Sequence, residues 1–204
     1  MSLAGRFLLR VRQLPAHFLS AWRICRLRCF EGSSHELMEI RRHTQFYVPV
    51  RSAGKGSLKI GFGNTFGWKS APRLISGEIH LQPRAVASTV IIGDRIAFSN
   101  NVSLCAMDEI SVGNDCRIGD RVVIYDCDFH ERHPHHRNRS AGPILPVLIG
   151  NNVWLGSRVM VLKGVSIGDS TVVAAGAVVT KSLPANVIAA GVPAIVVRKI
   201  STAP

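Results

Sequence analysis

Residues 149–180 read IGNNVWLGSRVMVLKGVSIGDSTVVAAGAVVT, and an aliphatic residue recurs in them at every sixth position. A Gly or another small residue usually follows it. The six pairs are Ile149-Gly150, Leu155-Gly156, Val161-Leu162, Ile167-Gly168, Val173-Ala174 and Val179-Thr180. A hexapeptide period is typical of a parallel β-helix, in which one aliphatic side chain per hexad enters a narrow core and three hexads close a coil of about 18 residues.

The same rhythm appears upstream, with a slip of two residues at Asp108-Glu109 and a rougher coil that begins at Ile60. Neither a helical period of 3.6 nor the alternation of a single strand fits these positions. The upstream pairs are Ile92-Gly93, Phe98-Ser99, Leu104-Cys105, Val112-Gly113, Ile118-Gly119 and Ile124-Tyr125. The sequence therefore predicts an all-β solenoid of about five coils over residues 46–200, with a short C-terminal segment.

Residues 1–45 differ in character, because arginines interleave with apolar residues in their first half. Arg10 and Arg12 interrupt the apolar run, which disfavours a signal peptide or a membrane span. We expect a basic amphipathic helical extension, broken near Pro15. Two interpretations stay open: residues 1–30 contact an anionic membrane surface, or the helix caps the open end of the solenoid or docks on a neighbouring subunit.

The composition narrows the partners and the compartment. The formal net charge of +12 favours an anionic partner. No zinc-finger, helix-turn-helix or interleaved aromatic and basic pattern is present, so nucleic acid is not expected. The five cysteines form no C-x-x-C pair and are odd in number. We expect buried thiols in a reduced, cytoplasmic protein, peripheral at the inner face of the membrane if residues 1–30 bind it.

Residues 130–148 interrupt the rhythm with a loop that contains four of the eight histidines. An insertion in a regular solenoid usually serves binding. Asp128 precedes His130 by two residues, which places both on one side of an extended strand. We expect Asp128 to orient His130 as a general base. Two other interpretations stay open, a merely solvated loop and a zinc site built from His130, His133 and His135 or His136.

Several motifs resemble the hexapeptide-repeat acyltransferases. They are Ile149–Gly156, Lys163–Asp169, Gly176–Lys181 and Asn186–Ala194. From Pro146 to Ile200 the chain is similar to the galactoside and maltose O-acetyltransferases. From about Gly54 it resembles the O-acetyltransferases of bacterial cell-surface polysaccharide synthesis, whose aspartate-rich turn is similar to Tyr125–His130.

The resemblance implies a left-handed β-helix, a homotrimer with active sites between subunits, acetyl-CoA as donor and no metal. His130 resembles the catalytic base, and Asn101, Asp126 and Trp154 fall with the residues that contact the acceptor. The Ser157 amide matches an oxyanion donor. The positions implied for the cofactor are Trp154, Gly156, Ser157, Ala174, Ala175, Thr180, Lys181 and Arg198.

The resemblance implies an acetyl-CoA-dependent O-acetyltransferase that modifies a sugar hydroxyl during synthesis of a capsule, O-antigen or exopolysaccharide. The differing N-terminus favours a larger glycan, or its sugar precursor, over a free galactoside. The main alternative is an N-acetyltransferase that acts on a nucleotide-linked amino sugar. A metal-dependent hydratase resembling the γ-type carbonic anhydrases, a non-catalytic assembly module and a succinyl donor also stay open.

Overall fold

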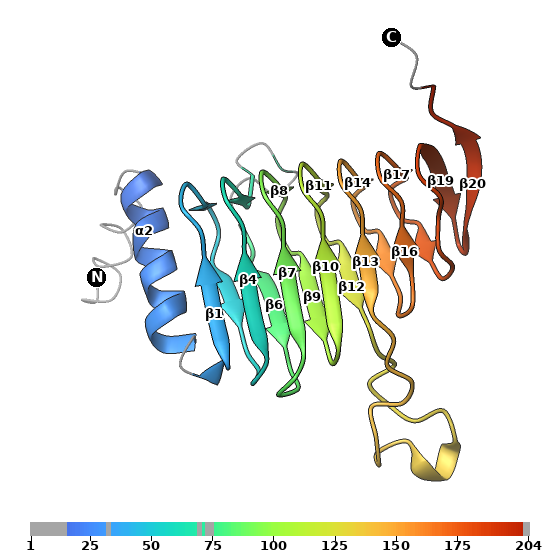
Figure 1. The fold of residues 1–204 in the computed structure, drawn as a ribbon, viewed down its shortest axis with the longest axis horizontal. Helices are drawn as coiled ribbons and strands as arrows, with labels where there is room; N and C mark the ends of the chain where they lie inside the picture. Colours follow the sequence, from blue (N-terminus) through green and yellow to red (C-terminus); the bar gives the residue numbers. More distant parts are fainter. Residues whose placement is uncertain (1–15, 32–33, 69–70, 72–75, 202–204) are drawn as a thin grey trace, which may run out of the picture.

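The computed structural model describes residues 16–31, 34–68, 71 and 76–201. Its strands wind into a triangular prism of three parallel sheets (Figure 1). Sheet A contains β1 (Leu37–Ile40), β4 (Ser57–Ile60), β7 (Thr89–Ile92), β10 (Glu109–Val112), β13 (Val147–Ile149) and β16 (Ser166–Ile167). Sheet C contains β3 (Val50–Ser52), β6 (Ile79–Pro83), β9 (Ser103–Ala106), β12 (Val123–Tyr125), β15 (Met160–Val161) and β18 (Val178–Val179).

Sheet B has eight strands, two more than sheets A and C, and its last two strands form an antiparallel hairpin. It contains β2 (Gln45–Phe46), β5 (Thr65–Phe66), β8 (Ala97–Phe98), β11 (Arg117–Ile118), β14 (Trp154–Leu155), β17 (Val172–Val173), β19 (Val187–Gly191) and β20 (Ala194–Lys199). The hexad positions stack in register, because Ile60 pairs with Ile92, Ile92 with Val112 and Val112 with Ile149. The sequence prediction of a parallel β-helix is therefore confirmed.

The small residue after each aliphatic one has a steric reason. A Cβ on Gly150 would lie 2.3 Å from Asp169 Oδ1, which is far inside contact distance. At the corner that follows sheet A, from β7 onward, the residue after the glycine is Asn or Asp, and its side chain accepts a hydrogen bond from an amide of the preceding coil. Asn151 Oδ1 accepts from Asn114 N at 2.9 Å, and Asp169 Oδ1 accepts from Asn151 N at 2.7 Å. These side chains satisfy turn amides that no strand could pair.

The β-helix begins at Leu37, nine residues before the expected start, and sheets A and C each contain six strands where about five coils were predicted. The first coil escapes the motif because its buried or partly buried positions, Ile40 and Phe46, are followed by Arg41 and Tyr47 instead of small residues.

The helix α2 (Ala16–Arg26), continued by the π-helical turn η1 (Leu27–Glu31), lies across the first coil (Figure 1). Ser20 Oγ accepts a hydrogen bond from Phe46 N at 2.8 Å, and Arg23 donates to Phe46 O at 2.9 Å. Leu27 is buried against the core. The helix thus covers backbone groups that an open solenoid end exposes, which is the capping interpretation. The predicted break near Pro15 and the segment before it lie outside the described residues.

Within the described ranges, no helix combines the length and the apolar character needed to cross a bilayer. Of the five free cysteines, Cys105, Cys116 and Cys127 are buried, as expected for coil positions, whereas Cys25 and Cys29 are exposed on the helical cap. Burial raises the pKa of Cys105 and of Cys116 to about 11, so both remain protonated thiols at neutral pH.

Candidate active site

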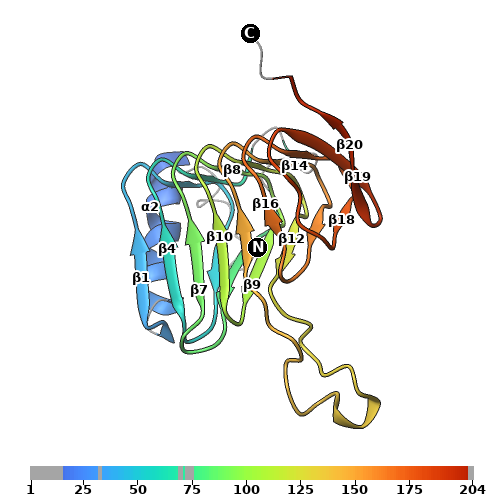
Figure 2. The ribbon, with the colours of Figure 1, turned by 45° about the vertical axis from the view of Figure 1, so that its right-hand side comes forward.

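The predicted loop leaves the corner between sheets C and A and projects away from the prism (Figures 1 and 2). It spans residues 126–146, because Val147 and Leu148 already belong to β13. An antiparallel bridge between Cys127 and Ile144 closes its base. At its tip lies the 3-10 turn η3 (Pro134–His136).

His130 lies exposed at the start of this loop. Its Nδ1 is 3.1 Å from the carbonyl oxygen of Arg137. A carbonyl only accepts hydrogen bonds, so the contact requires a proton on Nδ1 and leaves the Nε2 lone pair of the neutral ring free. Gly142 packs against the same residue, since a Cβ there would lie 2.4 Å from His130 O. The loop therefore holds one imidazole with a defined tautomer, as a general base requires.

Asp128 does not orient His130 in the way that the sequence suggested. Phe129 has a φ of +62°, so the run is not extended and the alternation argument fails. Asp128 instead accepts hydrogen bonds from Lys163 Nζ and, at 3.1 Å, from Arg132 Nε. Partial burial acts to raise the pKa of Asp128, but these two cations outweigh it and hold the pKa below its usual value. The carboxylate anchors the loop to the prism.

Asp126 was expected at the acceptor, but its side chain is fully buried. Its carboxylate accepts the amides of Met107, at 2.8 and 2.9 Å, and Asp108, at 2.7 Å. Burial raises the pKa of Asp126, and these two hydrogen bonds oppose the rise. The structure places the two-residue slip of the repeat at Met107 and Asp108, one residue before the predicted position, so Asp126 caps a structural turn and is buried away from an acceptor.

Replacing Asp126 by alanine should lower the free energy of unfolding by about 2 kcal/mol, because the two partly buried amides of Met107 and Asp108 lose their acceptor. Asp126→Asn keeps one carbonyl oxygen and should lose less than half as much. Urea unfolding of the three proteins measures both values. Equal stability of Asp126→Ala and the wild type would show that these amides find another partner.

A polar hollow of about 580 Å³ opens beside His130 over the outer face of sheet C. His80, Ser103 and Tyr125 line it from three successive strands, and His130 and Phe129 close it from the loop. A site of this size with hydroxyl and imidazole groups suits a sugar ring. Sequence reasoning missed these strand residues, although each adjoins a core aliphatic residue and so had to face outward.

Asn101, the other predicted acceptor contact, is a turn residue at the corner between sheets B and C. Its φ of +59° lies in the left-handed region, and its Nδ2 donates to the buried Asp120 Oδ1 at 3.1 Å. A Cβ on Gly77 would lie 2.0 Å from Asn101 Oδ1, so Gly77 packs against this side chain. These contacts give Asn101 a structural role, and its role in sugar binding stays a prediction.

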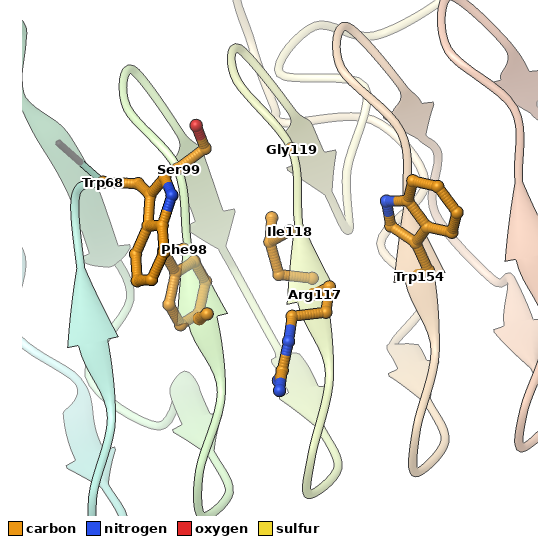
Figure 3. A pocket seen from close by; sticks show the side chains of 8 residues that line it. Trp68, Phe98, Ser99, Arg117, Ile118, Gly119 and Trp154 are labelled. Atoms are coloured by element: carbon orange, nitrogen blue, oxygen red, sulfur yellow. The ribbon is translucent and has the colours of Figure 1, made fainter. Parts of the chain in front are cut away.

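Trp154 occupies a shallow groove of about 210 Å³ on the outer face of sheet B (Figure 3). Its side chain is 56% exposed, and Trp68, 47% exposed, lies at the other end of the groove. Arg117 lies between them, on the neighbouring strand of Trp154. Its guanidinium donates to the carbonyl oxygens of Cys116 at 3.0 Å, and of Arg95 and Asp115 at 3.3 Å. Two indole faces beside a fixed cation suit an adenine ring or a sugar.

The implied thioester and pantetheine positions stack along the corner between sheets B and C. A Cβ on Gly156 would lie 2.6 Å from Ala175 N, so only glycine fits there. Within the described chain the Ser157 amide donates no hydrogen bond, which leaves it available to an oxyanion. The equivalent amides of Asp120 and Ala175 are also unbonded in the described chain, so geometry alone does not single out Ser157.

Thr180 and Lys181 follow β18, and Arg198 lies on β20, all of them exposed near the C-terminal end of the prism. In the described part of the chain neither Lys181 nor Arg198 has an ion-pair partner. Both charges therefore remain available for phosphate groups. The rings of His133 and His136 lie 4.7 Å apart, but among the described residues no three metal-ligating side chains converge.

The two hollows lie on different faces of the prism and share no lining residue. His130 belongs to the corner between sheets C and A, whereas Ser157 belongs to the corner between sheets B and C. One chain therefore does not bring the imidazole, the indole groove and the Ser157 amide together.

The chain is similar to several known acetyltransferases, in part of its sequence and in its fold. The family model for the bacterial transferase hexapeptide (six repeats) matches residues 146–181. The galactoside O-acetyltransferase of Escherichia coli K12 is 41% identical over 109 residues, which cover 51% of this chain and 52% of the relative. That of Lactococcus lactis is 43% identical over 112 residues, covering 55% and 54%. The chain thus spans about half the length of the curated relatives it matches.

Solved structures extend the likeness to most of the prism. The polySia specific acetyltransferase NeuO superimposes with a TM-score of 0.63 at 26% identity, covering 83% of this chain and 74% of the other. A galactoside acetyltransferase in complex with coenzyme A gives a TM-score of 0.51 at 29% identity, covering 76% and 66%. The predicted left-handed β-helix and the resemblance to hexapeptide-repeat acetyltransferases are confirmed.

Proposed function

Because this chain carries the hexapeptide repeat of the bacterial transferases on a left-handed β-helix, we propose that it transfers an acetyl group from acetyl-CoA to a sugar hydroxyl. The observation that carries the proposal is His130, whose Nδ1 is committed to Arg137 O and whose Nε2 is free beside the polar hollow. The galactoside acetyltransferase, solved with coenzyme A, supports the donor, and NeuO, a polySia specific acetyltransferase, supports a polysaccharide acceptor.

The reaction is a direct transfer. His130 Nε2 removes the hydroxyl proton as the oxygen attacks the thioester carbonyl, and the C–S bond then breaks. The same imidazolium returns its proton to the departing thiolate, so atoms and charges balance. The Ser157 amide stabilises the developing oxyanion, because a backbone N–H fixed by stacked turns needs no reorganisation. Trp154 flanks the donor, the small turn residues Ala174 and Ala175 admit the pantetheine arm, and Thr180, Lys181 and Arg198 hold the nucleotide end.

The separation of His130 from Trp154 and Ser157 supports a homotrimer in which neighbouring copies complete each site. A heterologous contact that closes on itself places sheet C of one copy beside sheet B of the next. In that arrangement the imidazole of one copy faces the indole groove and the turn amides of its neighbour. Trp68 and Trp154 are also exposed on sheet B, and contact with a neighbouring copy would cover these apolar side chains.

Transfer from isotope-labelled acetyl-CoA to a panel of glycans, with ester and amide products resolved by mass spectrometry, tests the proposal. We expect an ester on a polysaccharide or on its lipid-linked precursor. An amide on an amino sugar would instead establish the N-acetyltransferase alternative. Absence of acetyl-CoA binding would contradict both.

We also propose that α2 binds the cytoplasmic face of a membrane, in keeping with five free thiols. Phe18, 59% exposed, and Trp22, 49% exposed, share one face with Cys25 and Cys29, away from the residues that touch the first coil. Arg26 lies over the Trp22 ring at 5.9 Å, and Arg28 is exposed nearby. Aromatic side chains flanked by arginines fit an anionic interface.

The full chain should float with vesicles that contain anionic lipid and should not float with purely zwitterionic ones. Replacing Phe18 and Trp22 by serine removes the apolar face without touching the first coil, so flotation should fall by about tenfold. The variant should keep the wild-type melting temperature. Flotation that is independent of lipid charge or of these two residues would overturn the membrane role.

A further inference from the structure

A second hollow adjoins His130 and has an unusual charge. It has a volume of about 360 Å³ and lies between the loop and the turn after β6. Arg84, Arg137 and Arg139 line it together with His130, and no aspartate or glutamate does. Arg84, Phe129 and His130 also line the polar hollow over sheet C. The imidazole thus lies where the polar hollow meets this strongly basic hollow. We term the basic one, lined by Arg84, Arg137 and Arg139, the arginine hollow.

Arg84 is held in place without being neutralised. Its Nε and NH2 groups donate to Gln82 Oε1 at 3.2 and 3.0 Å, and its guanidinium carbon lies 5.1 Å from the centre of the Phe129 ring. An amide oxygen and a phenyl face orient a guanidinium but carry no full negative charge. Its remaining NH1 group makes no hydrogen bond within the described chain.

The acidic residues nearest in sequence are already engaged. Asp128 pairs with Lys163 and Arg132, and Glu131 accepts hydrogen bonds from Arg132 N at 2.8 Å and Ser140 Oγ at 3.2 Å. In the described part of the chain no ion pair involves Arg84, Arg137 or Arg139. Three uncompensated guanidinium groups around one concave space attract an anion.

We propose that the arginine hollow binds an anionic substituent, a carboxylate or a phosphate, on the acceptor glycan. The inference rests on the proposed function and adds the class of acceptor. The anion lies in the arginine hollow while the reacting hydroxyl of the same sugar, or of its neighbour, lies in the polar hollow at His130. Arg84, Arg137 and Arg139 are positioning residues, since they select and orient the acceptor and touch no reacting atom. The two charges assigned to the donor lie elsewhere, because Lys181 follows β18 and Arg198 lies on β20.

The test compares three matched acceptors: a carboxylate-bearing oligosaccharide, its carboxyl-reduced form and a phosphate-bearing analogue. The wild type should favour a charged acceptor over the neutral one by about 10–100-fold in kcat/KM, and the better of the two anions identifies the substituent. Arg84→Gln and Arg139→Gln should each raise KM for that acceptor by about tenfold and leave KM for acetyl-CoA unchanged. Arg84→Lys should recover part of the loss, and Lys59→Gln, an exposed charge on β4, should change nothing.

Two outcomes overturn the inference. Equal kcat/KM values for charged and neutral acceptors would show that the hollow binds no anion of the acceptor. Acetyl transfer by His130 would still stand. A rise in KM for acetyl-CoA in Arg84→Gln would assign the arginines to the coenzyme. Calorimetry with His130→Ala measures the binding of the same acceptors without turnover. In this experiment too, an anionic acceptor that binds no tighter than the neutral one contradicts the inference.

Discussion

Replacing His130 by alanine is expected to lower kcat by about 10²–10⁴-fold, because a sugar hydroxyl is a weak nucleophile that needs a base within hydrogen-bond reach. KM for acetyl-CoA should stay unchanged, since the residues assigned to donor binding do not include the imidazole. Steady-state kinetics with both substrates varied measures the two effects separately.

His130→Gln is the matched control for position. A glutamine amide can still donate to Arg137 O and keep the loop in place, but it accepts no proton. It should therefore be as inactive as His130→Ala while it binds acceptor like the wild type. Substantial turnover by His130→Gln would show that another group, with His80 the nearest candidate in the polar hollow, is the base.

Replacing Ser157 by proline should lower kcat by about 10²–10³-fold, because it removes the proposed oxyanion donor. The type of turn at Ser157 is compatible with proline. Val159 N donates to Gly156 O at 3.4 Å and Arg158 has a φ of +61°, which describes a turn with its left-handed residue in third place. Proline is favoured at the second place of such a turn, which is Ser157.

Ser157→Ala keeps the amide and should retain nearly full activity. Together the two variants separate the backbone N–H from the side chain. If Ser157→Ala were as impaired as Ser157→Pro, the hydroxyl and not the amide would carry the effect. A melting temperature of Ser157→Pro near that of the wild type confirms that the turn survived.

The repeat was predictable because its physical cause is local. Each aliphatic residue fills one core position, and each following glycine avoids a clash with the next coil, so Gly150 and its counterparts mark the fold in the sequence. The first coil was not predictable by the same rule, because Arg41 and Tyr47 stand where the motif has small residues.

The site was predictable in part. His130 stood out by its loop, but its partner depended on one backbone angle, the left-handed φ of Phe129, which turns Asp128 away toward Lys163. The family resemblance placed Asp126 at the acceptor, yet Asp126 caps a turn that the two-residue slip created. The arginine hollow joins Arg84 to Arg137 and Arg139 across the fold, and no local pattern connects them.

Complementation between two inactive variants tests the central claim, a catalytic site shared by neighbouring copies. His130→Ala and Ser157→Pro are each expected to be nearly inactive alone. The two variants are to be co-expressed with different tags, and the mixed assembly purified. If one copy supplies His130 and its neighbour the Ser157 amide, about a quarter of the sites in an equal, random mixture contain both, and activity returns to that fraction of the wild type. Activity no higher than that of the separate variants would contradict the account, because every site would then draw both groups from one chain.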